Sequence, residues 1–216
     1  MTRATAAALA LGLLAAAPAA QQQQPAAGDL ARRIQTRYES VRDFTAAFTQ
    51  TTRSALLPQT SVTSGTVKIR KPGLMRWEYV EPEKQTVGSD GTDFYVYVPA
   101  DRVVTYSPLP KPGEEDTALL FLAGRGNLAT DYITHLAAEQ PTGQWRLALT
   151  PRRAQDDYSV VVLMVDRRDL RLLGLEWSEH DGGGSTIRFT NYRENVGLKP
   201  AEFQFTRPRG VEAIRR

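Results

Sequence analysis

The sequence predicts an α+β fold: a single strongly curved antiparallel β-sheet, a half-barrel of about 10–11 strands, with short helices covering its concave apolar face. Two observations predict it. Short segments with the two-residue period of a strand recur along most of the chain, separated by Gly, Pro and Asp turns. An amphipathic segment near the N-terminus and an apolar segment in mid-chain interrupt this pattern and supply the helices.

The first 19 residues predict a signal peptide. Arg3 precedes an apolar run, Ala6–Ala17, that is too short to span a bilayer, which requires about 20 residues. Ala17 and Ala19 then stand at the A-x-A spacing of a signal peptidase site. We therefore expect export, with a signal peptide over residues 1–19, a flexible Gln-, Pro- and Ala-rich leader over residues 20–28, and one domain over residues 29–216.

The mature chain opens with one predicted helix and continues as strands. In Leu30–Val41, apolar residues recur at spacings of three and four, which predicts an amphipathic helix with Asp29 as its N-cap. After Asp43 the period changes to two, which is typical of strands. The expected strands lie in Phe44–Thr49, Thr66–Arg70, Met75–Tyr79, Phe94–Val98, Val103–Tyr106, Trp145–Leu149, Val160–Val165, Leu173–Trp177, Ile187–Tyr192 and Phe203–Phe205.

The region between Pro112 and Pro141 breaks the strand rhythm. Ala118–Ala123 is a continuous apolar run, and the apolar residues over 128–136 then follow at spacings of four, one and three. Such spacings favour short helices over strands. Because the apolar face of an open sheet must be covered, we expect these helices and the N-terminal helix to lie inside the curve.

The composition excludes several classes of site. The chain has no cysteine, so it has no disulfide, no thiolate nucleophile, no Cys-bound zinc and no lipidated cysteine. Of its two histidines, His180 stands in a Gly-rich turn and His135 at the end of the expected mid-chain helix, and no nucleophile elbow accompanies them. We expect no catalytic residue, no metal site and no cofactor. The net charge of +3 gives no indication of a nucleic-acid partner.

An ordered series of motifs extends along most of the mature chain. The motifs are Phe48-Thr49-Gln50, Ser64–Val67, Lys71–Tyr79, Pro82, Ser89-Asp90-Gly91 and Phe203–Glu212. In this order they resemble the LolA family of periplasmic lipoprotein carriers. The resemblance extends from about Leu30 to Val211, and the string K-P-G-L-M-R-W-E-Y followed by S-D-G is its most specific part.

The resemblance implies a half-barrel that encloses an apolar cavity, with helices packed in its mouth. It implies a soluble periplasmic chaperone, a monomer, that takes acylated lipoproteins from an inner-membrane ABC exporter. The carrier shields their acyl chains across the periplasm and hands them to an outer-membrane receptor lipoprotein. That receptor shares the fold but is itself lipidated, and a chain without cysteine matches the carrier instead.

Strand alternation selects the residues expected to line the acyl-chain cavity. The same side chains could equally form a solid hydrophobic core, and the alternation does not separate the two. The expected sheet wall consists of Ile69, Met75, Trp77, Tyr79, Phe94, Val96, Leu173, Leu175, Trp177 and Phe189, and the expected lid of Leu119, Leu120, Phe121 and Leu122.

The loop at Pro72 supplies the candidates for a lid latch. Members of the family often carry an Arg directly before this Pro, and its side chain latches the lid by binding helix-loop carbonyls. Here that position is Lys71, with Arg70 one residue earlier. An ammonium group can donate to carbonyls but lacks the planar fork of Arg, and Arg70 points to the opposite face if the strand persists. Two solvated basic residues are the alternative interpretation.

Two other functions stay open at this point. A lipid- or lipoprotein-sensing regulatory module could use the same half-barrel, although such proteins usually append a further domain. A secreted hydrolase with a composite site would depend on His180, and loss of turnover in His180→Ala would support it.

Overall fold

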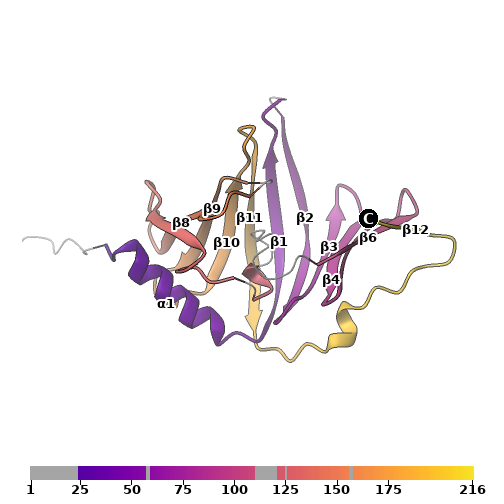
Figure 1. Ribbon diagram of the computed structural model, residues 1–216, viewed down its shortest axis with the longest axis horizontal. Helices are drawn as coiled ribbons and strands as arrows, with labels where there is room; N and C mark the ends of the chain where they lie inside the picture. Colours follow the sequence, from indigo (N-terminus) through magenta and orange to yellow (C-terminus); the bar gives the residue numbers. More distant parts are fainter. Residues whose placement is uncertain (1–23, 57–58, 110–120, 125, 156–157) are drawn as a thin grey trace, which may run out of the picture.

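The computed structural model describes residues 24–56, 59–109, 121–124, 126–155 and 158–216. Within these ranges the protein is mostly β, with one 12-stranded sheet, the helix α1, one short 3-10 helix and two helical residues at 121–122 (Figure 1). The elements are α1 (Ala27–Glu39), β1 (Asp43–Arg53), β2 (Thr60–Arg70), β3 (Leu74–Glu81), β4 (Gln85–Asp90), β5 (Asp93–Val98), β6 (Val103–Pro108), β7 (Tyr132–Leu136), β8 (Gln144–Pro151), β9 (Val160–Asp166), β10 (Leu172–Ser178), β11 (Gly184–Glu194), η1 (Pro200–Phe203) and β12 (Glu212–Arg215).

The sheet consists of two meanders that meet where β1 pairs with β11. The strand order is β12-β6-β5-β4-β3-β2-β1-β11-β10-β9-β8-β7. All neighbours are antiparallel except β12, which pairs with β6 in parallel. The expected purely antiparallel sheet of fewer strands is therefore corrected to a mixed sheet. A parallel pair needs a long crossover connection, and much of the chain lies between β6 and β12.

The long central strands form because apolar residues alternate along them. Phe44 and Phe48 on β1 are buried, and so are Val67 and Ile69 on the neighbouring β2. The register pairs Phe44 with Ile69, which places both side chains on the same face of the sheet. A one-residue shift of either strand would expose this apolar face to water, so the pattern fixes the register.

Helix α1 covers that face near the β7 edge. It begins at Ala27, so that Asp29 lies in its first turn rather than at the N-cap, which is Ala26. Its buried residues Leu30, Ile34 and Tyr38 recur every four positions and form one stripe. The helix contacts β7 and β8 and lies across the sheet rather than within its plane (Figure 1).

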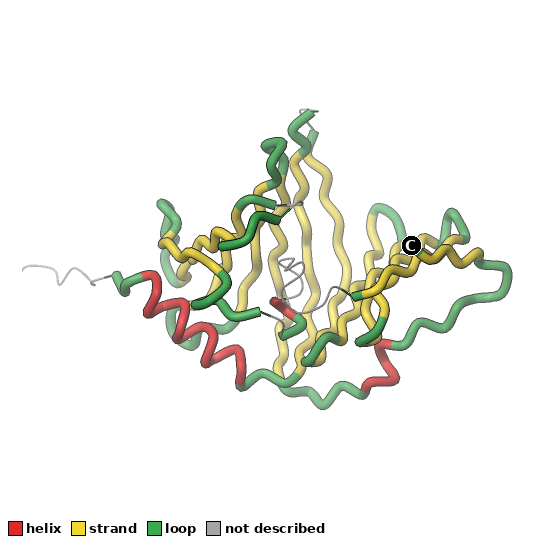
Figure 2. Tube along the Cα trace, in the orientation of Figure 1, coloured by secondary structure: helices red, strands yellow, loops and turns green. Residues whose placement is uncertain are grey.

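A second piece of chain, Phe121–Gly124, lies over the middle of the same face, where Figure 2 shows a short helical piece in front of the strands. We call it the covering segment. Phe121, Leu122 and Ala123 are buried in it. Together with α1, they join side chains of β1, β2, β3 and β7–β11 in a single hydrophobic cluster.

The C-terminal segment, residues 198–211, packs on the opposite face. Phe203 of η1 is buried, and the Phe205 ring packs at a tilt against Tyr95 with a ring-centroid distance of 5.1 Å. The Tyr95 hydroxyl donates a hydrogen bond to the carbonyl of Phe203. Tyr95, Val104 and Val211 form a second, smaller cluster there. The β4–β6 limb of the sheet is consequently packed on this face by the end of the chain.

Two predicted elements take another form. Tyr132–Leu136, expected to be helical, is strand β7, because its backbone pairs with β8 along the edge of the sheet. Phe203–Phe205, expected to be a strand, begins with the last residue of η1 and continues as an extended loop. This stretch joins no strand ladder, and Phe205 instead packs its ring against Tyr95 and Tyr97.

Within the described residues, no helix is long and apolar enough to cross a membrane.

Candidate functional site

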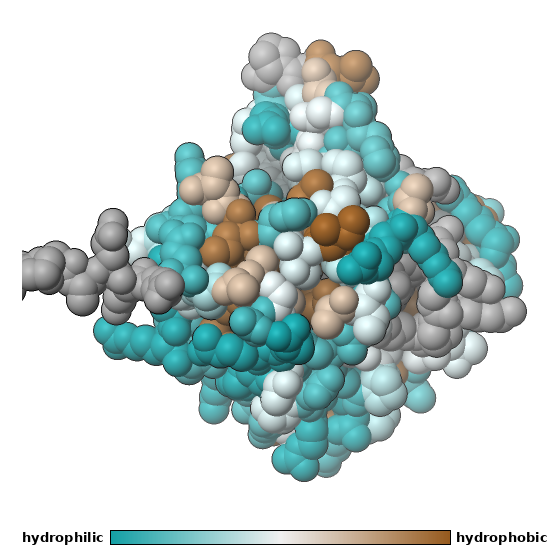
Figure 3. Space-filling view, turned by 60° about the vertical axis from the view of Figure 1, so that its left-hand side comes forward, coloured by the Kyte–Doolittle hydropathy of each residue, from teal (hydrophilic) through white to brown (hydrophobic). Residues whose placement is uncertain are grey.

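One face of the sheet lies beneath α1 and the covering segment. The half of this face that contains Phe44, Ala46 and Phe48 of β1 is apolar. Residues directly paired across strands share a face, so the register extends each row of side chains over several strands. Hydrophobic residues gather in the centre of the view in Figure 3, and hydrophilic residues surround them. Two rows define the face: Phe44, Ile69, Met75, Ser89 and Phe94, and then Ala46, Val67, Trp77, Val87 and Val96.

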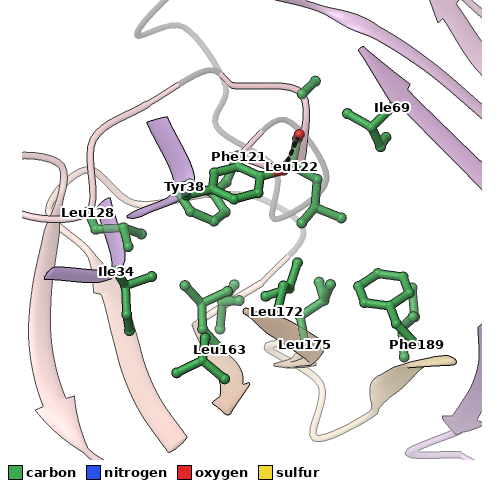
Figure 4. Packing of buried hydrophobic residues seen from close by; sticks show 14 of the residues in the cluster. Ile34, Tyr38, Ile69, Phe121, Leu122, Leu128, Leu163, Leu172, Leu175 and Phe189 are labelled. Carbon is green, nitrogen blue, oxygen red and sulfur yellow. Dashed lines mark hydrogen bonds between the residues drawn. The ribbon is translucent and has the colours of Figure 1, made fainter. Parts of the chain in front are cut away.

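Most of the expected sheet-wall residues lie together on this face. Figure 4 shows Phe121 and Leu122 opposite the strand residues Leu175 and Phe189. Tyr79 and Trp177 pack at the edge of the cluster and are half-buried. The expected residues that belong to the cluster core, each at most 8% exposed, are Ile69, Met75, Trp77, Leu175, Phe189, Phe121 and Leu122.

Three expected wall residues are placed differently. A β-bulge between Leu172 and Gly174 turns Leu172 into the cluster, and Leu173 is outside it. Phe94 and Val96 share the face of Trp77 by register but are half-buried and lie outside the cluster. The expected lid residues Leu119 and Leu120 lie outside the described residues.

An aromatic group that the sequence analysis did not select lies at the centre of the face. Phe48 makes edge-to-face contacts with Trp77 and Tyr79, both at a centroid distance of 5.0 Å. Gly65 makes room for it, since a Cβ there would stand 2.9 Å from the Phe48 ring and 2.0 Å from the carbonyl oxygen of Glu78. The alternation Phe44-Ala46-Phe48 was the signal that could have identified Phe48.

Tyr38 connects α1 to the covering segment. Its hydroxyl donates a 2.6 Å hydrogen bond to the carbonyl oxygen of Leu122, and its ring stacks on Phe121 at 5.1 Å (Figure 4). The neighbouring turn of the sheet also holds this segment, because the Gly73 N–H donates to the carbonyl of Ala123 at 2.8 Å. The covering segment is thus fastened to the helix and to the sheet by separate hydrogen bonds.

Lys71 holds the C-terminal end of α1. Its ammonium group donates to the carbonyl oxygen of Tyr38 and lies 3.9 Å from the centre of the Tyr38 ring. A cation is favourable at this position because the carbonyls of a helix end carry partial negative charge. The lysine stem also fills the space beside Gly124, where a Cβ would come within 2.4 Å of its Cδ.

Burial shifts the pKa values of both Lys71 and Tyr38. Burial lowers the pKa of Lys71 to about 8, although the carboxylates of Glu39 and Glu194 oppose the shift. Burial raises the pKa of Tyr38 well above its usual value, and the neighbouring Tyr192 and Glu194 add to this effect. The Tyr38 hydroxyl therefore keeps its proton and remains a hydrogen-bond donor at any physiological pH.

Arg70, the second latch candidate, is directed elsewhere. Its guanidinium donates a 2.6 Å hydrogen bond to the carbonyl of Leu198, at the start of the C-terminal segment. Lys68, on the same face of β2, pairs with Glu202 of η1 at 2.9 Å. Both cations consequently bind the C-terminal segment and not the covering segment.

The two histidines lie on the surface, and a separate cavity lies at the strand ends. His180 is exposed and contacts the backbone carbonyl of Gln155 at 2.7 Å, and His135 is exposed on β7. A cavity of about 180 Å³ lies at the ends of β1, β2, β10 and β11. Its lining residues are Thr51, Arg53, Thr60, Glu176, Trp177, Ser178, Gly184, Ser185 and Thr186.

The comparison with protein families decides the identity. The model of the family described as "Outer membrane lipoprotein carrier protein LolA" matches residues 39–206. The chain belongs to the LolA family. The outer-membrane lipoprotein carrier protein of Chromobacterium violaceum is 28% identical over 203 residues, which cover 94% of this chain and 95% of that protein. The carrier of Dechloromonas aromatica is 31% identical over 179 residues, with 82% and 83% covered.

Solved structures support the fold independently. An uncharacterized conserved protein from Thermus thermophilus superposes with a TM-score of 0.55 at 13% identity, covering 87% of this chain and 98% of that one. LolA proteins are periplasmic carriers of lipoproteins and not enzymes, so the predictions of family, of carrier function and of a non-enzymatic role are confirmed.

Proposed function

We propose that this LolA protein binds the acyl chains of lipoproteins between the apolar face of the sheet and the two segments that cover it. The observation that carries the proposal is the single hydrophobic cluster that α1, the covering segment and the sheet share. The cover touches the sheet mainly through side chains, and few hydrogen bonds fasten it. Moving the cover would expose a continuous apolar surface of the kind that binds hydrocarbon.

We further propose that the sheet curves as a half-barrel around this space. Its support is that one cluster joins Trp77 of β3 to Tyr132 of β7, although six other strands lie between β3 and β7 in the sheet. A flat sheet would keep such distant strands apart. The curvature would bring both limbs of the sheet within reach of the same cover.

The energetics require the cover to move. A triacylated cysteine carries about 45 methylenes, and at about 0.8 kcal/mol each their exposure to water costs roughly 35 kcal/mol. A carrier that recovered all of this free energy would not release its cargo. Separating α1 and the covering segment from the sheet costs free energy, and this cost offsets most of the gain from binding.

We assign the latch of the closed cover to Lys71, with Tyr38 as its partner. Lys71 holds the end of α1, and Tyr38 on α1 holds the covering segment. The ammonium group supplies one connection and the phenol supplies the next. Together the two groups replace the guanidinium group of the Arg that many family members carry at the position of Lys71.

The remaining assignments follow the family. We propose that residues 1–19 form a cleaved signal peptide, that an inner-membrane ABC exporter delivers the cargo, and that an outer-membrane receptor lipoprotein accepts it. The carrier then works as a soluble monomer in the periplasm.

The experiment that tests the function uses the exported form of the chain. The protein is purified from the periplasm of cells that make it, and bound molecules are identified by mass spectrometry. We expect acylated lipoproteins in the bound fraction, and their loss when Leu175 is replaced by Asp. Absence of any acylated molecule, together with normal lipoprotein sorting in depleted cells, would contradict the proposal.

A further inference from the structure

We propose that a polar row on the covered face binds the carbonyl oxygens of the glycerol esters that join acyl chains to a lipoprotein. The row consists of Gln50, Thr52, Thr63, Tyr79 and Ser185. This inference rests on the proposed carrier function and adds a subsite for the polar head of the cargo lipid.

The polarity of the face changes abruptly along β1. Phe44, Ala46 and Phe48 point to the hydrophobic cluster and are buried. Gln50 and Thr52 continue the same alternation, so they occupy the same face one and two steps further along. Along β1 the apolar side chains therefore end at Phe48 and polar side chains follow, whereas on the neighbouring β11 the buried Ile187 still pairs with Gln50.

The register extends this boundary to the neighbouring strands. Gln50 pairs with Thr63 of β2, and Thr52 pairs with Ser185 of β11. Phe48 pairs with Gly65, and Gly65 pairs with Tyr79 of β3. The polar side chains thus stand on four adjacent strands, β3, β2, β1 and β11, beside the aromatic group.

Hydrogen bonds hold most of the row in place. The Tyr79 hydroxyl donates to Oε1 of Gln50 at 3.1 Å, and Nε2 of Gln50 donates to Oγ1 of Thr52 at 3.3 Å. The Thr52 and Ser185 hydroxyl oxygens lie 2.8 Å apart. The Gln50 amide carries two N–H groups, of which this chain of bonds uses one.

Two buried polar atoms at the boundary have no partner among the described residues. They are Oγ1 of Thr63 in the row and the indole nitrogen of Trp77, whose side chain lies next to Tyr79 on the same face. Trp77 is 1% exposed, so solvent does not satisfy its N–H group. A buried donor without an acceptor costs free energy, and an indole N–H can only donate. Both groups are ready to bind an acceptor that the protein itself does not supply.

An ester carbonyl is the acceptor that fits this place. It carries lone pairs and no proton, and it is the first polar group that follows the hydrocarbon of an acyl chain. Hydrocarbon would lie against the aromatic group and the apolar rows, and its ester oxygens would reach the polar row. The row contains no Lys or Arg, so it matches a neutral ester rather than a phosphate group.

The test compares two synthetic probes with the full mature chain. The first is a lipopeptide whose glycerol carries two hexadecanoyl esters, and the second is the same lipopeptide with two hexadecyl ethers, which lack the carbonyl oxygens. We expect the wild-type protein to bind the ester about tenfold more tightly than the ether. A matched phospholipid pair distinguishes the source: a preference for the ester in both pairs assigns the row to glycerol esters in general, and a preference confined to the lipopeptide assigns it to lipoproteins.

Variants test which residues cause the preference. Thr63→Val and Trp77→Phe keep much of the shape and remove one donor each, and each should lower the ratio of ester to ether affinity about threefold. Thr66→Val, on the opposite face of β2, is the matched control and should leave the ratio unchanged. Because each ratio is measured within one variant, a partial loss of folded protein cancels.

Equal affinity of the wild type for ester and ether, or an unchanged ratio in both Thr63→Val and Trp77→Phe, would overturn this inference and leave the carrier function intact. Failure of the wild type to bind either lipopeptide would overturn the carrier function, and the inference with it.

Discussion

The hydroxyl of Tyr38 donates a hydrogen bond of 2.6 Å to the carbonyl oxygen of Leu122, and both groups are buried. The bond joins the two pieces of chain that cover the apolar face, α1 and the covering segment. It therefore makes them one unit, which Lys71 and Gly73 attach to the sheet. Four predictions follow from the residues around this bond and are each open to measurement.

Tyr38→Phe should destabilise the closed protein by about 1–2 kcal/mol, because it leaves the buried carbonyl of Leu122 without a donor. The phenyl ring retains the stacking on Phe121. The free energy of unfolding is measured by urea denaturation. Tyr97→Phe is the control, since Tyr97 lies on the opposite face among the residues of the smaller cluster. Equal losses in the two variants would contradict a special role for Tyr38.

Lys71→Leu should slow the release of cargo. Loss of the latch destabilises the closed empty state, so less of the free energy of cargo binding is spent on opening it. If the closed state loses about 1.4 kcal/mol of stability, cargo binds tenfold more tightly. Release of a fluorescent lipopeptide into lipid vesicles measures the rate. Arg70→Leu serves as the control because Arg70 binds the C-terminal segment. Normal release by Lys71→Leu would exclude this residue as the latch.

The stability of the wild type relative to Lys71→Met should rise as the pH increases from about 8 towards 10. Burial lowers the pKa of Lys71 to about 8 in the folded protein. An unfolded lysine keeps its proton up to about pH 10.4, so between these values the unfolded state binds more protons and higher pH favours folding. Below pH 8 the difference should be constant. Urea midpoints of both proteins over this range give the difference, and a flat profile would refute the assigned pKa.

Gly124→Ala should destabilise the protein by about 1–2 kcal/mol or more, because the residue adopts a left-handed backbone and its Cβ would collide with Lys71. The φ angle is 77°, and the nearest atom would be 2.4 Å away. Gly143→Ala is a matched control with a φ angle of 82° and nothing within 4 Å. Thermal unfolding should show a larger loss for Gly124→Ala, and identical losses would mean that the contact with the lysine stem has no effect.

Much of the fold could be predicted from the sequence because alternation along a strand depends only on local order. Ile69, Met75 and Trp77 were placed on the correct face by this pattern alone. Leu173 was not, because a bulge adds one residue to β10 and moves Leu172 into the cluster. A bulge is set by how two strands pair, so the alternation along one strand cannot predict it.

Long-range contacts account for the other differences. Strand β7 forms because β8 is available to pair with it, and its own spacing of apolar residues resembles that of a helix. The hydrogen bond from Tyr38 to the covering segment could not be predicted from the sequence either. Its four-residue spacing from Ile34 placed it on the buried stripe of α1, but its partner Leu122 is far along the chain.

The packing of the C-terminal segment on the β4–β6 limb has a mechanical consequence. With Phe203 and Phe205 on the face opposite the covering segment, this limb has a backing that resists bending away from that segment. In the proposed binding mode, room for a lipid comes from displacement of α1 and the covering segment, with the limb acting as a fixed wall. The length of chain that connects these two pieces to the sheet therefore limits how wide the entrance can become.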